Sequence, residues 1–106
     1  MRFVQLGARR NEIAGSWTYP SVEQGEGAYP EKALQDEVSG IAMIDCLVDV
    51  SGKLISCDIV SETPADYGFG AATVKIFLEG AHVDPASIPG GLVPGCRKKF
   101  SYRWSL

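Results

Sequence analysis

Three cysteines and a single histidine are the residues of this chain best suited to catalysis or metal binding. Zinc sites use closely spaced cysteine pairs or several histidines, whereas Cys46, Cys57 and Cys96 contain no C-x-x-C pair. A cysteine nucleophile needs a base beside it. His82 falls in a helix-to-loop segment, and no cysteine has an activating neighbour in the sequence. The sequence therefore predicts no metal, no cofactor and no enzyme, with catalysis by Cys57 or Cys96 as a competing hypothesis.

The charged residues favour a solvated surface over a metal or nucleic-acid site. Asp45, Asp49 and Asp58 recur at outward positions of two predicted strands, as on a face in contact with water. The net charge is −3, yet the last ten residues include Arg97, Lys98, Lys99 and Arg103 and no acidic residue. One short basic stretch is narrower than the face that nucleic acids require. We interpret it as an edge strand protected by basic residues, and we expect no nucleic-acid partner.

A hairpin is the clearest element that would position these residues. Apolar and polar residues alternate from Ile41, and again from Leu54 to Val60, with Ser51-Gly52 as a two-residue turn between the two runs. One face of the hairpin gathers Ala42, Ile44, Cys46, Val48 and Val50 from the first strand and Ile55, Cys57 and Ile59 from the second.

A second helix and a last strand are predicted after the hairpin. Apolar residues recur at helical spacing from Phe69 to Phe77, with Asp66 as the candidate N-cap and Gly80 past the end. The final residues then alternate strictly, which indicates an antiparallel strand with one face on a core and one in water. The core face holds Phe100, Tyr102, Trp104 and Leu106, and the wet face holds Lys99, Ser101, Arg103 and Ser105.

The segment before the hairpin is predicted to contain one short helix over 31–38. Pro30 suits its first position, and Gly40 is a candidate C-terminal cap. Residues 1–28 are expected to form an extended or partly ordered arm, with a short strand from Arg2 to Leu6 and with Trp17 or Tyr19 laid on the domain.

The order helix, hairpin, helix, strand predicts one α+β domain over residues 29–106. Every apolar face is buried if two helices lie on one face of a three-stranded antiparallel sheet, which gives a two-layer fold. The chain has no apolar run of about 20 residues, the length that a bilayer span requires. Its first residues also lack the pattern of a secretion signal, so we expect any such signal to lie outside these residues.

Cys46 and Cys57 are candidates for a structural disulfide. With a two-residue turn at Ser51-Gly52, paired residues have numbers that add up to 103, so Cys46 lies opposite Cys57. The bridge would form in an oxidising compartment. Two alternatives stay open: the pair remains as two buried thiols, or a bulge at Gly52 shifts the register and separates them. Cys96 is left free near the start of the last strand.

Residues 29–106 resemble the C-terminal domain of the TonB family, the energy transducers of Gram-negative outer-membrane transport. The resemblance follows the chain in order and depends on the combined spacing of several short motifs. It is closest to the branch of the family that has one cysteine on each hairpin strand. These motifs are YPEKAL from Tyr29, Gly40, the turn at Ser51-Gly52, VSETP from Val60, GFGAA from Gly68, AHVDPA from Ala81 and the strand from Phe100 to Leu106.

Two departures from the family pattern concern energy transduction more than the fold. Residues 80–84 are less basic than the corresponding stretch of many members and lack its aromatic residue. The family's membrane anchor and Pro-rich spacer are absent from these 106 residues. We therefore expect the chain to be a piece of a longer protein or a stand-alone relative.

The resemblance implies a periplasmic domain that binds an extended receptor segment by β-strand addition and couples inner-membrane energy to outer-membrane transport. The implied partner is a TonB-box-like segment of an outer-membrane receptor, with ExbB/ExbD-type proteins contacting regions not present here. The implied peptide-binding residues are Lys99, Phe100, Ser101, Tyr102, Arg103, Trp104 and Ser105. Lys99 and Arg103 are the expected contacts, the three aromatic residues belong to the core, and Tyr29-Pro30 is a further candidate. The alternative is a structural module that dimerises through the same edge strand.

Overall fold

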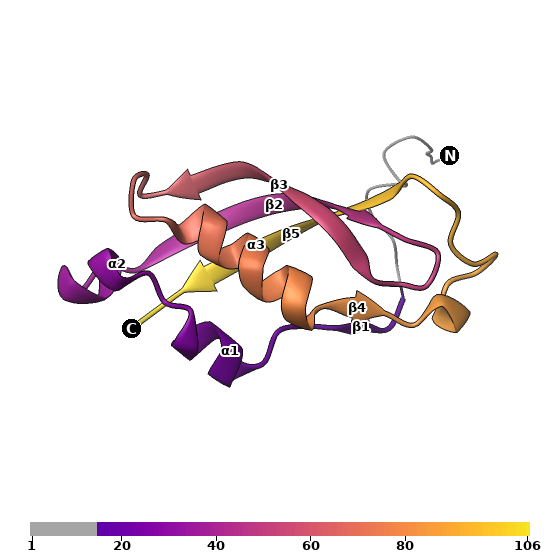
Figure 1. Ribbon diagram of the computed structural model, residues 1–106, viewed down its shortest axis with the longest axis horizontal. Helices are drawn as coiled ribbons and strands as arrows, with labels where there is room; N and C mark the ends of the chain where they lie inside the picture. Colours follow the sequence, from indigo (N-terminus) through magenta and orange to yellow (C-terminus); the bar gives the residue numbers. More distant parts are fainter. Residues whose placement is uncertain (1–14) are drawn as a thin grey trace, which may run out of the picture.

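A three-stranded antiparallel sheet organises the domain (Figure 1). The computed structural model describes residues 15–106. The strands are β1 (Trp17–Thr18), β2 (Gly40–Val48), β3 (Leu54–Thr63), β4 (His82–Val83) and β5 (Cys96–Trp104). The helices are α1 (Val22–Gly27), α2 (Glu31–Gln35), α3 (Phe69–Gly80) and the 3-10 turn η2 (Pro85–Ser87). The main sheet has the order β3-β2-β5, so β2 is central and β5 is an edge strand.

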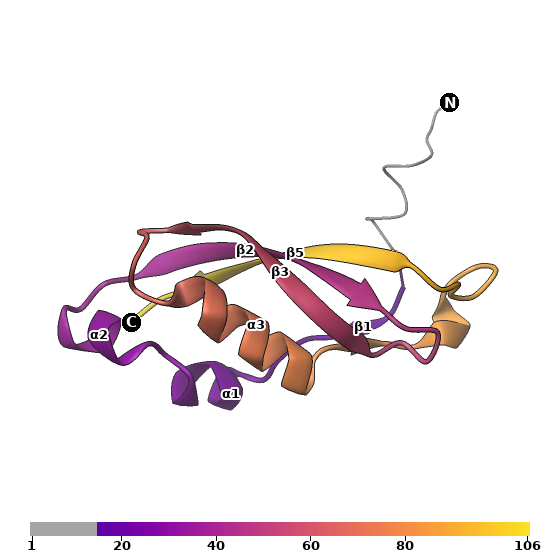
Figure 2. The ribbon, with the colours of Figure 1, turned by 45° about the horizontal axis from the view of Figure 1, so that its top comes forward.

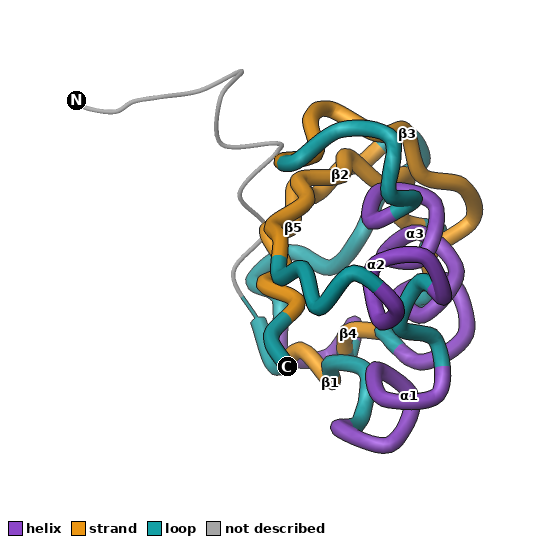
Figure 3. Tube along the Cα trace, turned by 90° about the vertical axis from the view of Figure 1, so that its left-hand side faces the viewer, coloured by secondary structure: helices purple, strands orange, loops and turns teal. Residues whose placement is uncertain are grey.

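The three α-helices among residues 15–106 lie on one face of this sheet (Figures 2 and 3). The predicted α+β fold with a three-stranded antiparallel sheet is therefore confirmed. The structure adds α1 and a second small sheet in which β1 pairs with β4, neither of which was predicted from the sequence. None of the helices among the described residues is long and apolar enough to cross a membrane. The predicted strand from Arg2 to Leu6 lies outside residues 15–106.

The core forms where α3 covers the sheet. Phe69, Thr73, Ile76 and Phe77 are the buried residues of α3 that recur at helical spacing. They pack on the buried face of β2 and β5, which includes Ala42, Ile44, Cys46, Val48, Phe100 and Trp104. Ring contacts of Phe77 with Phe100 and of Phe69 with Trp104 hold α3 to β5.

The hairpin turn differs from the predicted two-residue turn. Asp49 closes it through its N–H, which donates to the carbonyl of Lys53, and Gly52 adopts a φ of 93°. This longer turn pairs Val48 with Leu54, one step out of the expected register. A bulge at the next step restores the register, so that Leu47 pairs with Ser56 and Cys46 with Cys57.

Several predicted caps and core positions were wrong. α2 ends at Gln35 instead of 38, and Gly40 begins β2 instead of capping a helix. The N-cap of α3 is Gly68, whose φ of 85° suits glycine, and not Asp66. Four residues assigned to the core face are exposed: Val50, Ile55, Ile59 and Leu106, at 54%, 55%, 46% and 63%. Val50 lies in the turn and Leu106 lies beyond the end of β5. Ile55 and Ile59 lie in the outer strand β3, where Leu54 is buried instead.

Candidate functional site

The predicted binding residues occupy the edge strand β5. Lys99 to Trp104 lie within it, and Ser105 follows directly. Phe100 and Trp104 are buried, Tyr102 is half-buried, and Lys99, Ser101 and Arg103 are exposed, as the sequence alternation predicted. Among residues 15–106, β2 is the only strand that pairs with β5.

The outward backbone groups of β5 can be assigned from the sheet register. The Cα atoms of Cys46 and Cys57 are 4.0 Å apart, which identifies a non-hydrogen-bonded pair between β2 and β3. Cys46 then directs its N–H and C=O to β5, where it pairs with Lys98. Because these directions alternate along a strand, the even-numbered residues of β5 bond to β2. Arg97, Lys99, Ser101 and Arg103 direct their backbone groups away from the sheet.

A buried hydrogen-bond chain anchors the end of β5 to α3. The indole Nε1–H of Trp104 donates to Thr73 Oγ1 at 2.8 Å, and the Thr73 hydroxyl donates to the carbonyl of Phe69 at 2.7 Å. Trp104 is 2% exposed and Thr73 is fully buried, so an unpaired indole N–H here would be costly. The chain fixes the position of the edge relative to the helix layer.

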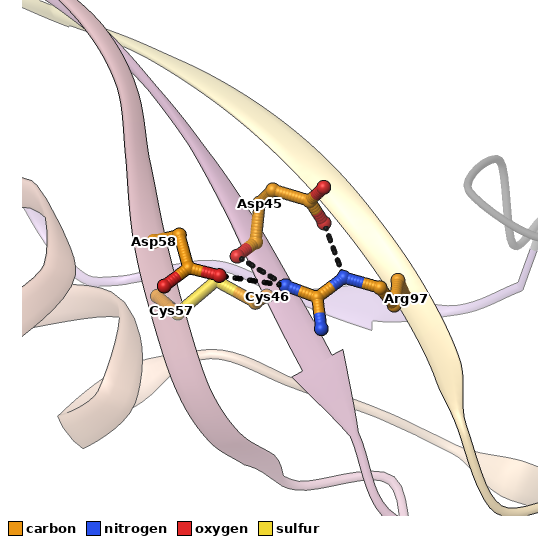
Figure 4. Close-up of polar contacts among 5 residues, drawn as sticks. All are labelled: Asp45, Cys46, Cys57, Asp58 and Arg97. Atoms are coloured by element: carbon orange, nitrogen blue, oxygen red, sulfur yellow. Dashed lines mark hydrogen bonds and ion pairs between the residues drawn. A yellow bond between two sulfur atoms is a disulfide. The ribbon is translucent and has the colours of Figure 1, made fainter.

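Arg97 ties the start of β5 to both other strands on the open face (Figure 4). Its Nε lies 3.1 Å from a carboxylate oxygen of Asp45, and its Nη2 lies 3.1 Å from one of Asp58. Nη2 also donates to the backbone carbonyl of Asp45 at 3.2 Å. The ion pairs are partly exposed, so we assign them a modest contribution to stability. Lys99 and Arg103, farther along the same face, carry the exposed positive charge of the edge.

The predicted Cys46–Cys57 disulfide is present. It joins β2 to β3, on the side of the sheet away from β5, and Cys96 is free at the first position of β5. The bridge belongs to the scaffold, because it lies in the two strands that do not form the candidate edge.

A cleft lies between α1 and the end of β5. Its volume is about 220 Å³. It is lined by Val22, Gly25, Glu26, Tyr29, Tyr102, Arg103, Trp104 and Ser105. The lining therefore includes four of the seven predicted site residues together with Tyr29, the other candidate contact.

The walls of this cleft are fixed by local contacts. Tyr29 donates its hydroxyl to the carbonyl of Val38 at 2.6 Å and packs edge-on against Trp104. Tyr102 packs between Trp104 and Phe77, with ring centroids 4.9 and 5.7 Å away. These contacts hold both aromatic side chains in place without a ligand.

Sequence reasoning missed α1, which forms one wall of the cleft, although the sequence contains a signal for this helix. Ser21 and Gln24 form a capping box, in which Ser21 Oγ accepts from the Gln24 N–H and Gln24 Oε1 accepts from the Ser21 N–H. The pattern S-x-x-Q is a known helix start. The extended arm expected over residues 1–28 therefore contains a helix at Val22–Gly27. Trp17 and Tyr19 do lay their rings edge-on against Phe100, as expected.

The groups of the catalytic alternative lie in three different strands, and Cys57 is bonded to Cys46 in the disulfide. His82 lies in β4, opposite Thr18, and is exposed, while Cys96 is at the start of β5. No group of three or more potential metal ligands occurs among residues 15–106.

Within residues 15–106, hydrogen bonds away from β5 perturb the titratable groups of Asp49 and Tyr67. The Ser51 hydroxyl and the backbone N–H of Lys53 donate to Asp49, which lowers the pKa of that carboxyl. A hydrogen bond to Asp36 raises the pKa of the Tyr67 hydroxyl. The Asp49 contacts lie within the hairpin turn and Tyr67 packs against the core, so we assign both groups structural roles.

No protein-family model and no curated protein matches this sequence. The TonB resemblance therefore stays a prediction.

Proposed function

We propose that this domain is a non-enzymatic binding module that takes up an extended protein segment by strand addition along β5. In the setting implied by the TonB resemblance, the segment belongs to an outer-membrane receptor and the domain works in the periplasm. The disulfide supports the periplasmic location, because structural disulfides persist in oxidising compartments.

The outward backbone groups of β5 carry this proposal. Arg97, Lys99, Ser101 and Arg103 offer N–H and C=O groups along one edge, and no second strand pairs with them among residues 15–106. An added strand satisfies such groups with main-chain hydrogen bonds, while its side chains provide selectivity. The buried Trp104–Thr73 hydrogen bond holds the edge in place, so little ordering is needed on binding.

The exposed charges of β5 favour an acidic partner over a second copy of the chain. Lys99 and Arg103 point to the open face four residues apart, where a partner's acidic side chains would lie opposite them. Two copies of β5 paired antiparallel about Ser101 would instead place Lys99 opposite Arg103. Like charges directly opposite are unfavourable, which weighs against the dimer that this edge could otherwise form.

A titration followed by NMR tests the proposal. The probe is the heptapeptide Glu-Val-Glu-Val-Glu-Val-Glu, and the control replaces each glutamate by lysine. We expect the acidic peptide to shift the amides of residues 97–105, most strongly those of the outward-facing Lys99, Ser101 and Arg103. We expect the lysine peptide to bind at least about tenfold more weakly. Unchanged amides in the folded protein would refute strand addition at β5.

Sedimentation at increasing protein concentration tests the alternative. A monomer throughout the micromolar range agrees with an edge that is free for a partner. A tight homodimer whose formation shifts the same β5 amides would favour the self-associating module.

A further inference from the structure

The cleft between α1 and β5 lies beside the edge where the proposed partner would add. Figure 3 shows α1 on the helix side of the sheet. The β5 side chains that line the cleft from this side are Tyr102 and Trp104. In a β-ladder, directly opposed residues point to the same face. A partner residue opposite Tyr102 or Trp104 would therefore point toward the cleft, and its two neighbours would point to the open face.

The lining of the cleft suits one apolar side chain. Its apolar walls are provided by Val22, Tyr29, Tyr102 and Trp104. The Val22 side chain is exposed although it faces the cleft. Glu26, Arg103 and Ser105 provide a polar rim. An engineered cavity of about 150 Å³ holds a benzene ring. The cleft volume of about 220 Å³ therefore has room for one leucine-sized or aromatic side chain.

We propose that this cleft is a side-chain pocket that selects the partner strand. The ligand is an extended segment that places one apolar residue in the cleft and acidic residues on the opposite face, toward Lys99 and Arg103. This inference rests on the proposed strand addition and adds to it the position at which an apolar residue is required.

Gly25 sets the width of the pocket. A Cβ atom at this position would lie 2.5 Å from the Tyr102 hydroxyl, so any side chain forces α1 and Tyr102 apart or moves the Tyr102 ring into the hollow. A Cβ atom at Gly27, in the same helix, would have no atom within 4 Å. Gly25→Ala and Gly27→Ala therefore make the same chemical change in one helix, and only the first disturbs the cleft.

Two isomeric peptides test the proposal. The first is Glu-Thr-Glu-Leu-Glu-Thr-Glu, and the second exchanges the leucine with the preceding glutamate, which moves the leucine to the open face. Their affinities for the wild-type protein are measured by calorimetry, with NMR to locate the contact. We expect the first to bind at least about tenfold more tightly, the size expected for burying one aliphatic side chain. Gly25→Ala should abolish the difference, and Gly27→Ala should keep it.

The outcomes separate the pocket from strand addition. Equal affinities of the two peptides, with β5 amides shifted by both, would overturn the pocket and leave strand addition standing. No binding by either peptide to the folded protein would overturn both. The peptide comparison uses wild-type protein, so it remains decisive even if Gly25→Ala fails to fold.

Discussion

Reduction of the Cys46–Cys57 disulfide should destabilise the domain by an amount that follows from its place in the sheet. The two cysteines are 11 residues apart and join adjacent positions of β2 and β3. Closing a loop of about this length removes conformational entropy from the unfolded chain worth about 3 kcal/mol at 25 °C. We expect the reduced thiols to keep their places, because Cys46 is fully buried in the core and Cys57 packs beside it.

This free energy translates into a change of melting temperature. Unfolding entropy of about 2.1 cal/mol/K per residue gives about 0.2 kcal/mol per kelvin for a chain of 106 residues. A loss of about 3 kcal/mol then lowers the melting temperature by roughly 13 °C. Because β5 lies on the other side of β2, peptide affinity should not change while the reduced protein remains folded.

Thermal and urea unfolding with and without a reducing agent measures this effect. Cys96→Ser provides the background, because it removes the free thiol and leaves the bridge. Thiol titration of the unfolded wild-type protein should find one free cysteine before reduction and three after it. Equal melting temperatures in the two states would refute the calculation, and three free thiols before reduction would refute the bridge itself.

Three further predictions concern single residues. Thr73→Val should cost about 2–3 kcal/mol of unfolding free energy, because it leaves the buried Trp104 indole N–H unpaired. Thr73→Ser keeps the hydroxyl and should lose only about 1 kcal/mol, so equal losses in urea unfolding would refute this assignment. Gly52→Ala should destabilise the fold more than Gly90→Ala does. Both glycines have a positive φ, but only Gly52 faces a backbone carbonyl of β4. Similar melting temperatures of the two variants would contradict this prediction. The pKa of Asp49 is lowered in the folded protein, so its ionised form stabilises the fold above its ordinary pKa of 3.8, and this stability is lost as pH falls through the lower folded value. The difference in unfolding free energy between the wild type and Asp49→Asn should therefore shrink below about pH 3.8. A difference that stays constant down to pH 2 would contradict the assignment.

The sequence was most informative where one periodicity extends over several residues. The alternation from Lys99 to Trp104 predicted both the strand and its buried face, because one side of β5 meets the helix layer and the other meets water. The spacing from Phe69 to Phe77 predicted α3 for the same reason. The match of Cys46 with Cys57 was also predicted, but two register changes were needed to produce it: the longer turn and the bulge beside it.

The features that sequence reasoning missed depend on contacts between distant segments. α1 is only six residues long, too short to stand out by apolar periodicity. The cleft it forms with β5 requires Gly25 to approach Tyr102, a contact between distant parts of the chain that no local pattern encodes. The cap at Gly68 was missed because an αL glycine at a helix start resembles an ordinary loop glycine in sequence.

A proline at Ser101 tests the central claim most directly. The Ser101 N–H points away from β2, so Ser101→Pro removes an outward donor and blocks an added strand while the β2 ladder stays intact. Ser101→Ala keeps the N–H and serves as the matched control. We expect Ser101→Pro to stay folded, to lose at least about tenfold in affinity for Glu-Val-Glu-Val-Glu-Val-Glu and to lose the β5 amide shifts, with Ser101→Ala unchanged. A folded Ser101→Pro protein that binds this peptide as the wild type does would contradict strand addition at β5.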